Sequence, residues 1–539
     1  MPRIIMTVAA VAACIVASIL PAGCASPPQI VTISPGRGAG DVPTNQPIEI
    51  VFDRSMDEAS VSAHFHLLPS SPGRVRWQNP RTMLFDHPAL QPSSKYQAVL
   101  EGGYRDSAGG VNGLRHDWQF KTEGPPAISG STPAEGDRSV DPATYLALTF
   151  SRPMDLSSLR RAISLSPSIP TAIRADTGDP RRVLIAPQGL LYANTTYSLT
   201  VLPSARDGHG NRLQAGVVVT FTTGPRQPLK HWVGFAAAPE QKPVGSGVWI
   251  VNDVAFPRQL VPATVSSFTW SPDGTKLLAR SRDGTWSVLP VSGGSPTPLP
   301  VSGNWAAFVT GGAYASLDGG TLRLLSPGGQ VTDVATSVGE AAVSPGGEKI
   351  AFTVPSGTGS EIDAYDVNVH TRYRLDGASG LIDQLAWAPD GQAIAYRLSA
   401  SDPGQRQIEV RTLSGAGATV TVATGRVSSP QWQAGSRNVL FLATIDTDVG
   451  PVAKVFVRSL TQQPASGLSA AGAMPTRNDL DLQSFAVSPD GREIAFLSSA
   501  GGHTSVWWMN SDGTGVTQLA TYDPGRFPYS ATDLSWTPS

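Results

Sequence analysis

The sequence predicts an all-β protein in which two β-sandwiches are followed by a β-propeller. Two different internal repeats carry this prediction. A unit of roughly 100 residues occurs twice before residue 224, and a shorter unit recurs in six stretches between Trp270 and Trp536. Glycine (55 residues) and proline (46 residues) are frequent, which suits many short strands and turns. Charged residues make up only 15 %, so the composition excludes a disordered chain.

The shorter unit consists of an apolar strand, a Ser-Pro-Asp-Gly turn and a second apolar strand. Proline sets φ at the first corner of the turn, aspartate binds its own backbone, and glycine takes the left-handed position. A further strand, turn and strand follow, as from Ser505 to Leu519, so each unit supplies about four strands, the content of one blade. The copies are FTWSPDGTKLLA from Phe268, AAVSPGGEKIAF from Ala341, LAWAPDGQAIAY from Leu385, a weaker PQWQAGSRNVLF from Pro430, FAVSPDGREIAF from Phe485 and LSWTPS from Leu534.

The blade count follows from these copies and from strand-like runs that no copy precedes. A degenerate copy begins at Trp305, and two strand-like runs near His231 and Gly247 have no Ser-Pro-Asp-Gly strand before them. We expect the C-terminal strand, Leu534 to Trp536, to complete the first blade, because such closure removes an exposed sheet edge. Seven blades result, and six or eight remain alternatives because the spacing varies.

The repeats resemble the WD40-like repeats in the propeller of the periplasmic TolB family. The resemblance is strongest in SPDG at 271–274 and 488–491 and in VWWMNSDGTGVTQL at 506–519. It is specific for the type of blade. It implies contacts with proteins of the cell envelope and does not name a partner.

The longer unit predicts two immunoglobulin-like (Ig-like) sandwiches, because about 100 residues with about seven short strands is their size. Its copies contain FDRSMD from Phe52 and FSRPMD from Phe150, and a later Tyr96 matches Tyr197. These motifs resemble the bacterial Ig-like domain of S-layer proteins, although the first copy has Ser55 where the family has proline. The predicted domains are Ig-like domain 1 (30–123), Ig-like domain 2 (124–224), a linker (225–230) and the propeller (231–539).

The N-terminus predicts export. Arg3 precedes an apolar run from Ile4 to Leu20, which is typical of a signal peptide over residues 1–23. The segment LPAGC resembles a bacterial lipobox, which implies that Cys24 is lipidated and that residues 24–29 are a lipid-anchored tether. Pro21 departs from the family pattern. Cleavage near Gly23 without a lipid, or an uncleaved anchor, are the alternatives, and all three place the body outside the cytoplasm.

Motifs for catalysis, metals and nucleic acids are missing from the sequence. It contains no G-x-S-x-G, H-E-x-x-H or C-x-x-C. His64 and His66 would share one face of a strand and could serve a metal, but a solvent-facing strand edge is favoured because no third ligand is visible. A net charge of -2 gives no basis for binding nucleic acid. We therefore predict no catalytic residue, no metal site and no cofactor.

Two recurrent residue types in the propeller invite a functional interpretation. Aspartates in turns could bind calcium, but a β-turn needs aspartate at those positions, and the structural role is favoured. Tryptophans at one position of the repeat could form a ligand platform, but packing between blades is favoured. The aspartates are Asp273, Asp283, Asp390, Asp490 and Asp512, and the tryptophans are Trp270, Trp387, Trp432 and Trp536.

Trp507 and Trp508 are the candidate partner-binding residues. They are adjacent in a predicted strand, so they must face opposite sides of the sheet. One of them is then expected to be partly exposed and able to contact a partner.

The predicted function is that of a non-enzymatic surface lipoprotein of the cell envelope. An Ig-like stalk would present the propeller, which would bind a protein or glycan partner. The lipid would anchor the protein on the outer face of the cell membrane or in the periplasm. The alternative is a propeller enzyme that acts on an envelope polysaccharide or small molecule in the central channel. The inner strands carry mostly Ala, Val, Leu and Trp, which is poor material for acid–base catalysis.

Overall fold

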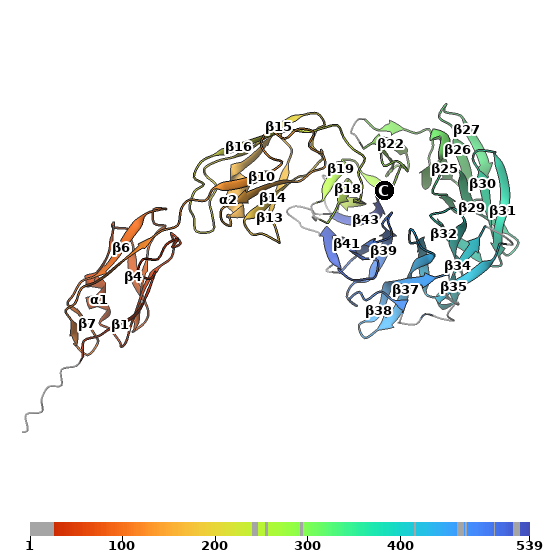
Figure 1. Cartoon of the computed structure of the whole chain (residues 1–539). Coiled ribbons are helices and arrows are strands. Elements are labelled where there is room, and N and C mark those ends of the chain that lie inside the picture. Colours follow the sequence, from red (N-terminus) through yellow and green to blue (C-terminus); the bar gives the residue numbers. More distant parts are fainter. Residues whose placement is uncertain are drawn as a thin grey trace, which may run out of the picture. The chain divides into compact units, whose positions relative to one another are not determined.

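The computed structural model describes residues 26–239, 246–253, 257–291, 295–413, 417–460, 468, 472–500, 502–520 and 529–538. The predicted signal peptide and Cys24 lie outside the described residues. The chain forms two compact units (Figure 1). The first holds the chain up to Ser129 with Phe150–Ile163 and Val201–Val217, and the second holds Gly130–Thr149, Ser164–Thr200 and Val218–Ser539. No helix in the described ranges is long and apolar enough to cross a membrane.

The first Ig-like domain pairs a four-stranded sheet, β1-β2-β5-β4, with a three-stranded sheet, β3-β6-β9, and a short β7-β8 hairpin. Its elements are β1 (Ile30–Ser34), β2 (Ile48–Phe52), α1 (Glu58–His64), β3 (Phe65–Leu68), β4 (Arg74–Asn79), β5 (Thr82–Asp86), β6 (Lys95–Leu100), β7 (Tyr104–Arg105), β8 (Val111–Asn112) and β9 (His116–Lys121).

Alternating side chains explain how this sandwich forms its core. Ile48, Ile50 and Phe52 are buried along β2, and the residues between them are partly exposed. Helix α1 begins where the Asp57 carboxylate accepts the Ser60 N–H. This helix includes His64, so the expectation that His64 and His66 share a strand is wrong: the chain remains helical until Phe65 begins β3.

The second Ig-like domain repeats the pattern with sheets β10-β11-β14-β13 and β12-β15-β16. Its helix α2 is again capped by an aspartate, Asp155. A buried tyrosine also recurs, since the hydroxyl of Tyr96 accepts the Gln91 N–H and that of Tyr197 accepts the Tyr192 N–H. The elements are β10 (Ile128–Thr132), β11 (Leu146–Phe150), α2 (Leu156–Ala162), β12 (Ile163–Ser166), β13 (Thr171–Ala175), β14 (Arg182–Pro187), β15 (Thr196–Val201) and β16 (Val217–Thr222).

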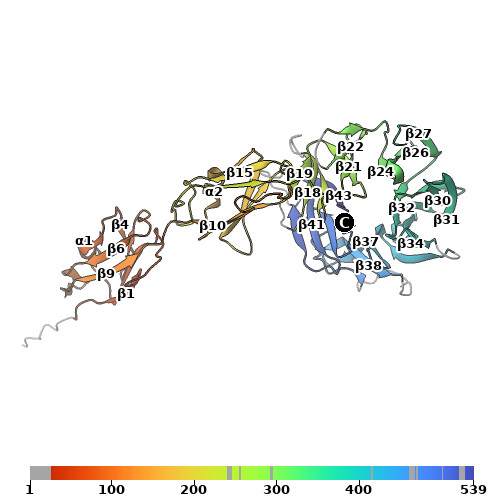
Figure 2. The same cartoon turned by 45° about the horizontal axis from the view of Figure 1, so that its top comes forward.

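In the described part of the chain after residue 232, seven antiparallel sheets lie around a common centre (Figures 1 and 2). The sequence predicts seven blades, and we number these sheets as blades. Blade 1 contains β17 (Val233–Pro239), β18 (Gly247–Val251), β19 (Arg258–Val261) and β43 (Tyr529–Trp536). Blade 2 contains β20 (Val265–Trp270), β21 (Lys276–Ser281), β22 (Trp286–Pro290) and β23 (Thr297–Pro298).

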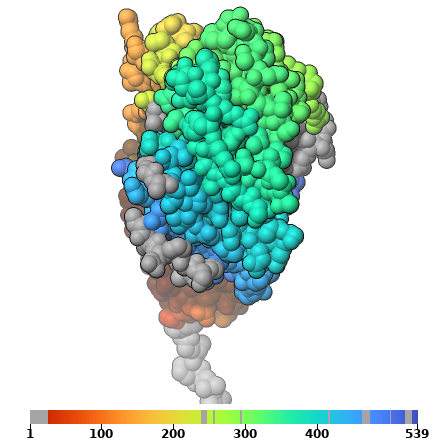
Figure 3. Space-filling model, turned by 90° about the vertical axis from the view of Figure 1, so that its right-hand side faces the viewer, coloured from red at the N-terminus to blue at the C-terminus, as the bar shows by residue number. Residues whose placement is uncertain are grey.

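The remaining blades follow in chain order, and Figure 3 shows the side of the propeller on which the middle ones lie. Blade 3 contains β24 (Trp305–Phe308), the 3-10 helix η1 (Thr310–Gly312), β25 (Tyr314–Asp318), β26 (Thr321–Leu325) and β27 (Val331–Ala335). Blade 4 contains β28 (Ala341–Val343), β29 (Lys349–Ser356), β30 (Gly359–Asp366) and β31 (Thr371–Ala378). Blade 5 contains β32 (Leu381–Trp387), β33 (Ala393–Ser399), the 3-10 helix η2 (Pro403–Gln405), β34 (Arg406–Thr412) and β35 (Thr419–Gly425). Blade 6 contains β36 (Val427–Trp432), β37 (Asn438–Thr447) and β38 (Gly450–Ser459). Blade 7 contains β39 (Leu482–Val487), β40 (Glu493–Ser498), β41 (Ser505–Asn510) and β42 (Thr517–Ala520).

The hydrophobic clusters of the propeller lie between blades. One cluster joins blades 1 and 2, and others join each following pair up to blades 6 and 7. A last cluster, which includes Phe235, Leu497 and Leu534, joins blade 7 to blade 1. Each sheet therefore buries its faces against its neighbours, as the repeat predicts.

The C-terminal strand closes the ring. Strand β43 pairs antiparallel with β17, from Val233 opposite Trp536 to Pro239 opposite Tyr529. Closure by residues far apart in the chain covers the inner edge of β17, and β43 becomes the innermost strand of the sheet. The prediction that the C-terminal strand completes the first blade is confirmed.

Truncating Leu534 tests the contribution of this closure. Its side chain is 9 % exposed and lies in the cluster shared by blades 7 and 1. We expect Leu534→Ala to lower the free energy of unfolding by about 2–4 kcal/mol, because it leaves a cavity in a packed core. Urea unfolding of the full chain measures this. Val449→Ala, at a site 66 % exposed, is the control and should change it by less than about 0.5 kcal/mol. Equal effects of the two substitutions would contradict the role given to the closing strand.

Candidate functional site

The inner ring of the propeller, formed by the first strand of each blade with β43 serving blade 1, lies at the centre in Figure 2. Polar side chains of this ring reach the backbone of the next blade. Glu340 accepts the N–H groups of Gln384 (2.6 Å) and Leu385 (3.0 Å). Gln384 in turn accepts the N–H of Ser429 at 2.6 Å.

Two further side chains of the inner ring make the same kind of contact. Gln431 of blade 6 accepts the Val487 N–H of blade 7 at 3.1 Å. Asp533 of blade 1 accepts the Phe268 N–H of blade 2 at 3.4 Å. These hydrogen bonds satisfy backbone donors at the centre of the ring, where the strands converge.

The recurrent tryptophans link the blades in the opposite direction. The indole N–H of Trp387 donates to the carbonyl of Ala342, that of Trp432 to Ala386, and that of Trp536 to Ala486, at 2.9–3.0 Å. Each acceptor belongs to the preceding blade. Trp270 is likewise buried, at 7 % exposure. The favoured interpretation of these residues as packing between blades is confirmed.

Burial changes the acidity of the inner-ring carboxyls. Asp533 lies in the wall of the ring, and burial raises its pKa from 3.8 to about 6. Burial also raises the pKa of Glu340, while the N–H groups of Gln384 and Leu385 oppose that shift. Both shifts arise from loss of water around a structural hydrogen-bond acceptor.

The turn aspartates stabilise their own turns, which is the interpretation that the sequence favours. The Asp273 carboxylate accepts the Ser271 hydroxyl at 2.6 Å and the Thr275 N–H at 3.0 Å. Asp490 makes the equivalent bonds to Ser488 and Arg492. These bonds hold the pKa of both carboxyls below the usual range.

Trp507 and Trp508 face opposite sides of β41, as expected, and both are half-buried. Trp507 stacks on Phe496, with ring centroids 6.3 Å apart, and packs on the cluster between blades 6 and 7. Trp508 packs on the cluster between blades 7 and 1. Their contact with a partner stays a prediction, and so does lipidation at Cys24, outside the described residues.

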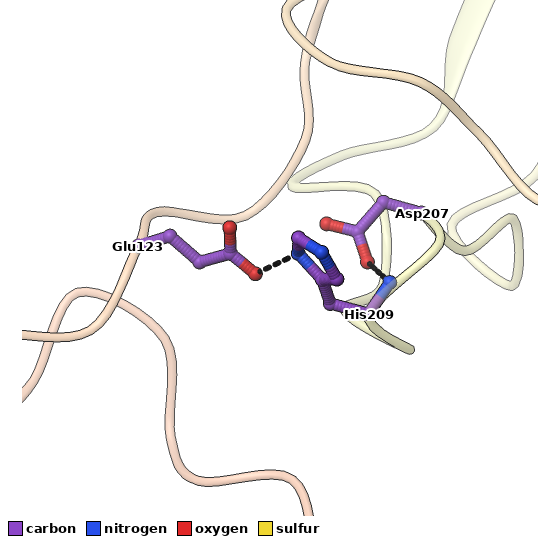
Figure 4. Close-up of side chains that lie close together, drawn as sticks. All are labelled: Glu123, Asp207 and His209. Atoms are coloured by element: carbon purple, nitrogen blue, oxygen red, sulfur yellow. Dashed lines mark hydrogen bonds and ion pairs between the residues drawn. The ribbon is translucent and has the colours of Figure 1, made fainter. Parts of the chain in front are cut away.

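A buried polar cluster lies in the first unit, where Glu123 meets the turn that contains Asp207 and His209 (Figure 4). The possible metal-ligand atoms of these three residues all lie within 4.8 Å of one another. Glu123 is 4 % exposed and Asp207 is 2 % exposed. This is the one group with a metal-ligand arrangement among the described residues.

Every carboxylate oxygen in this cluster already has a donor. Glu123 accepts from Asn211 Nδ2 at 2.7 Å, lies 2.8 Å from His209 Nδ1, and forms an ion pair with Arg152. Asp207 accepts the N–H groups of His209 and Asn211 at 3.0 and 2.8 Å. A metal would have to displace a guanidinium that cannot lose its proton. The geometry therefore favours a structural clasp, which we call the Glu123 clasp.

A second buried charge, Arg258 of β19, lies in the second unit and was not singled out from the sequence. Its guanidinium lies 4.0 Å from the centre of the Tyr145 ring and 5.6 Å from that of Trp232. One Nη donates to the carbonyl of Thr144 at 2.6 Å. Burial lowers the pKa of Arg258 to about 10, so it remains a cation at neutral pH.

Comparisons with known proteins agree with this architecture at its N-terminal end. Residues 25–122 and 123–223 each match the family described as bacterial Ig-like domain. No curated protein sequence matches the chain.

Several solved structures resemble the chain at low identity. TolB from Acinetobacter baumannii is 15 % identical, with a TM-score of 0.38, and the match covers 70 % of this chain and 83 % of that one. A quinonprotein alcohol dehydrogenase-like protein from Bacteroides thetaiotaomicron is 9 % identical, with a TM-score of 0.42, covering 77 % and 99 %. The propeller domain of a protease from Pyrococcus furiosus is 13 % identical, with a TM-score of 0.31, covering 48 % and 71 %.

Removing the Asp533 carboxyl should change how stability depends on pH. In the folded state Asp533 keeps its proton up to about pH 6, whereas in the unfolded chain it releases the proton near pH 3.8. The Asp533 carboxyl therefore lowers the free energy of unfolding as the pH rises between those two values. In Asp533→Asn that contribution is absent. We expect the stability of the variant relative to the natural chain to rise by about 2–3 kcal/mol from about pH 4 to about pH 7. Urea unfolding at each pH tests this, and a difference independent of pH would contradict it.

Glu123→Gln tests the clasp. The amide cannot neutralise Arg152, so we expect the free energy of locally opening the turn around Asp207 to fall by about 2 kcal/mol. Hydrogen exchange at the His209 and Asn211 amides should then be about 30-fold faster. Glu58→Gln, at an exposed helix position, is the control. Protection that appears on adding zinc and is lost in Glu123→Gln would instead establish a metal site.

Proposed function

We propose that the protein is a non-enzymatic lipoprotein of the bacterial cell envelope. Two Ig-like domains form a stalk, and the propeller binds a protein or glycan partner. The match of both N-terminal domains to the bacterial Ig-like family supports an envelope location. The lipobox-like segment that ends at Cys24 supports anchoring by a lipid.

The observation that carries the non-enzymatic part is the use of polar groups in the inner ring. Acid–base catalysis needs carboxylates that are free to meet a substrate. In the described residues of the inner ring, Glu340 and Asp533 accept backbone N–H groups of the next blade. Asp383 of β32 forms a two-point ion pair with Arg397 at 2.6 and 2.7 Å. All three carboxylates thus serve the ring itself, which favours binding over catalysis in the channel.

Crosslinking in cells tests this proposal. A tagged full-length protein is crosslinked, captured and compared with Cys24→Ala and with Cys14→Ala, whose substitution falls in the predicted signal peptide. We expect the natural chain and Cys14→Ala to carry a lipid on the mature N-terminus and to recover the same discrete envelope component. Cys24→Ala should lose both. Turnover of an envelope polysaccharide by the purified protein would contradict the non-enzymatic proposal.

A further inference from the structure

A cavity of about 500 Å³ opens between blades 5 and 6, next to the first turn of each blade. Pro389 and Asp390 line it from the turn of blade 5. Gly435 and Arg437 line it from the turn of blade 6. Its volume lies within the range of about 300–1,000 Å³ that is usual for ligand pockets.

The corresponding turns touch at two other junctions. A Cβ added to Gly491 of blade 7 would lie 2.7 Å from the Ala434 carbonyl oxygen of blade 6. At the junction of blades 3 and 4, a Cβ on Gly347 would lie 2.7 Å from the Thr310 nitrogen. In the turn of blade 6, the position equivalent to Gly491 is Ser436, an exposed residue that lines the cavity. We call this cavity the 5/6 cleft.

The lining of the 5/6 cleft combines an apolar wall with a free positive charge. Trp432, Leu460 and Ala393 supply apolar surface, and the Trp432 indole N–H is already used by Ala386. Asp390 adds a carboxylate to the lining, and its Oδ1 accepts the N–H of Gln392 within its own turn at 2.9 Å. The exposed guanidinium of Arg437 has no hydrogen bond or ion pair with any described residue.

We propose that the 5/6 cleft binds an extended peptide segment of a protein partner that carries an acidic side chain beside an apolar one. The acid pairs with Arg437, and the apolar side chain packs against Trp432 and Leu460. This inference rests on the proposed binding function and assigns it a site. A glycan fits less well, because sugars stack on an exposed aromatic face and Trp432 is half-buried between blades.

Peptide binding to the purified full-length protein tests the site. The probes are fluorescent pentapeptides, Gly-Leu-Asp-Leu-Gly and the same peptide with Asn or Lys in place of Asp. We expect the Asp peptide to bind about fivefold more tightly than the Asn peptide, since one partly exposed ion pair separates them. Arg437→Gln should abolish that difference, and Arg437→Glu should make the Lys peptide the preferred one.

Arg492→Gln is the matched control, because Arg492 occupies the same position of the repeat on the blade 7 turn, which touches the turn of blade 6, and Arg492 is not among the residues that line the 5/6 cleft. It should leave all affinities unchanged. Melting temperatures confirm that each variant folds. A preference for Asp that survives in Arg437→Gln, or no binding of any peptide, would overturn the proposal.

A photo-crosslinking residue at Ser436, in the lining of the cleft, separates this inference from the proposed function. Crosslinking in cells from this position to the partner captured by the full chain supports both. Capture of a partner by the full chain, with no crosslink from position 436, would leave the binding function standing and overturn the cleft as its site.

Discussion

The apolar core of the propeller belongs to the gaps between sheets. Seven clusters link consecutive blades in a closed cycle, and the last joins blade 7 to blade 1. A single four-stranded sheet has two apolar faces and cannot bury them alone. The stability of every blade therefore depends on its neighbours, and the β17–β43 pairing lets this dependence run around the whole ring.

Buried polar groups complement this core where elements converge. At the centre of the ring, side chains such as Glu340 and Trp387 join one inner strand to the next in both directions. In the first unit, the Glu123 clasp ties a turn to a segment more than 80 residues away in the chain. These groups orient elements that apolar packing alone would leave free to slide.

The repeats predicted the architecture well, because each copy carries its turn chemistry locally. The pairing of the C-terminal strand with β17, the structural use of the turn aspartates and the placement of Trp432 between blades all follow from one repeat unit. The Glu123 clasp and the burial of Arg258 could not be predicted from the repeats. Their partners are remote in the chain, and each is a single residue that belongs to no recurring motif. The one available signal was the His209 turn, which differs from its counterpart Ser107–Gly110 in the first copy. The prediction that His64 lies in a strand is wrong because a seven-residue helix is too short to leave a periodic pattern in the sequence.

The closing strand also governs when the propeller can form. Blade 1 is built from β17–β19, which end at Val261, and from β43, which begins at Tyr529, so about 270 residues are synthesised between its two parts. Until β43 arrives, the inner edge of β17 is open to pairing with any other extended chain. A chain truncated before β43 would therefore keep an unpaired strand edge at the inner side of blade 1.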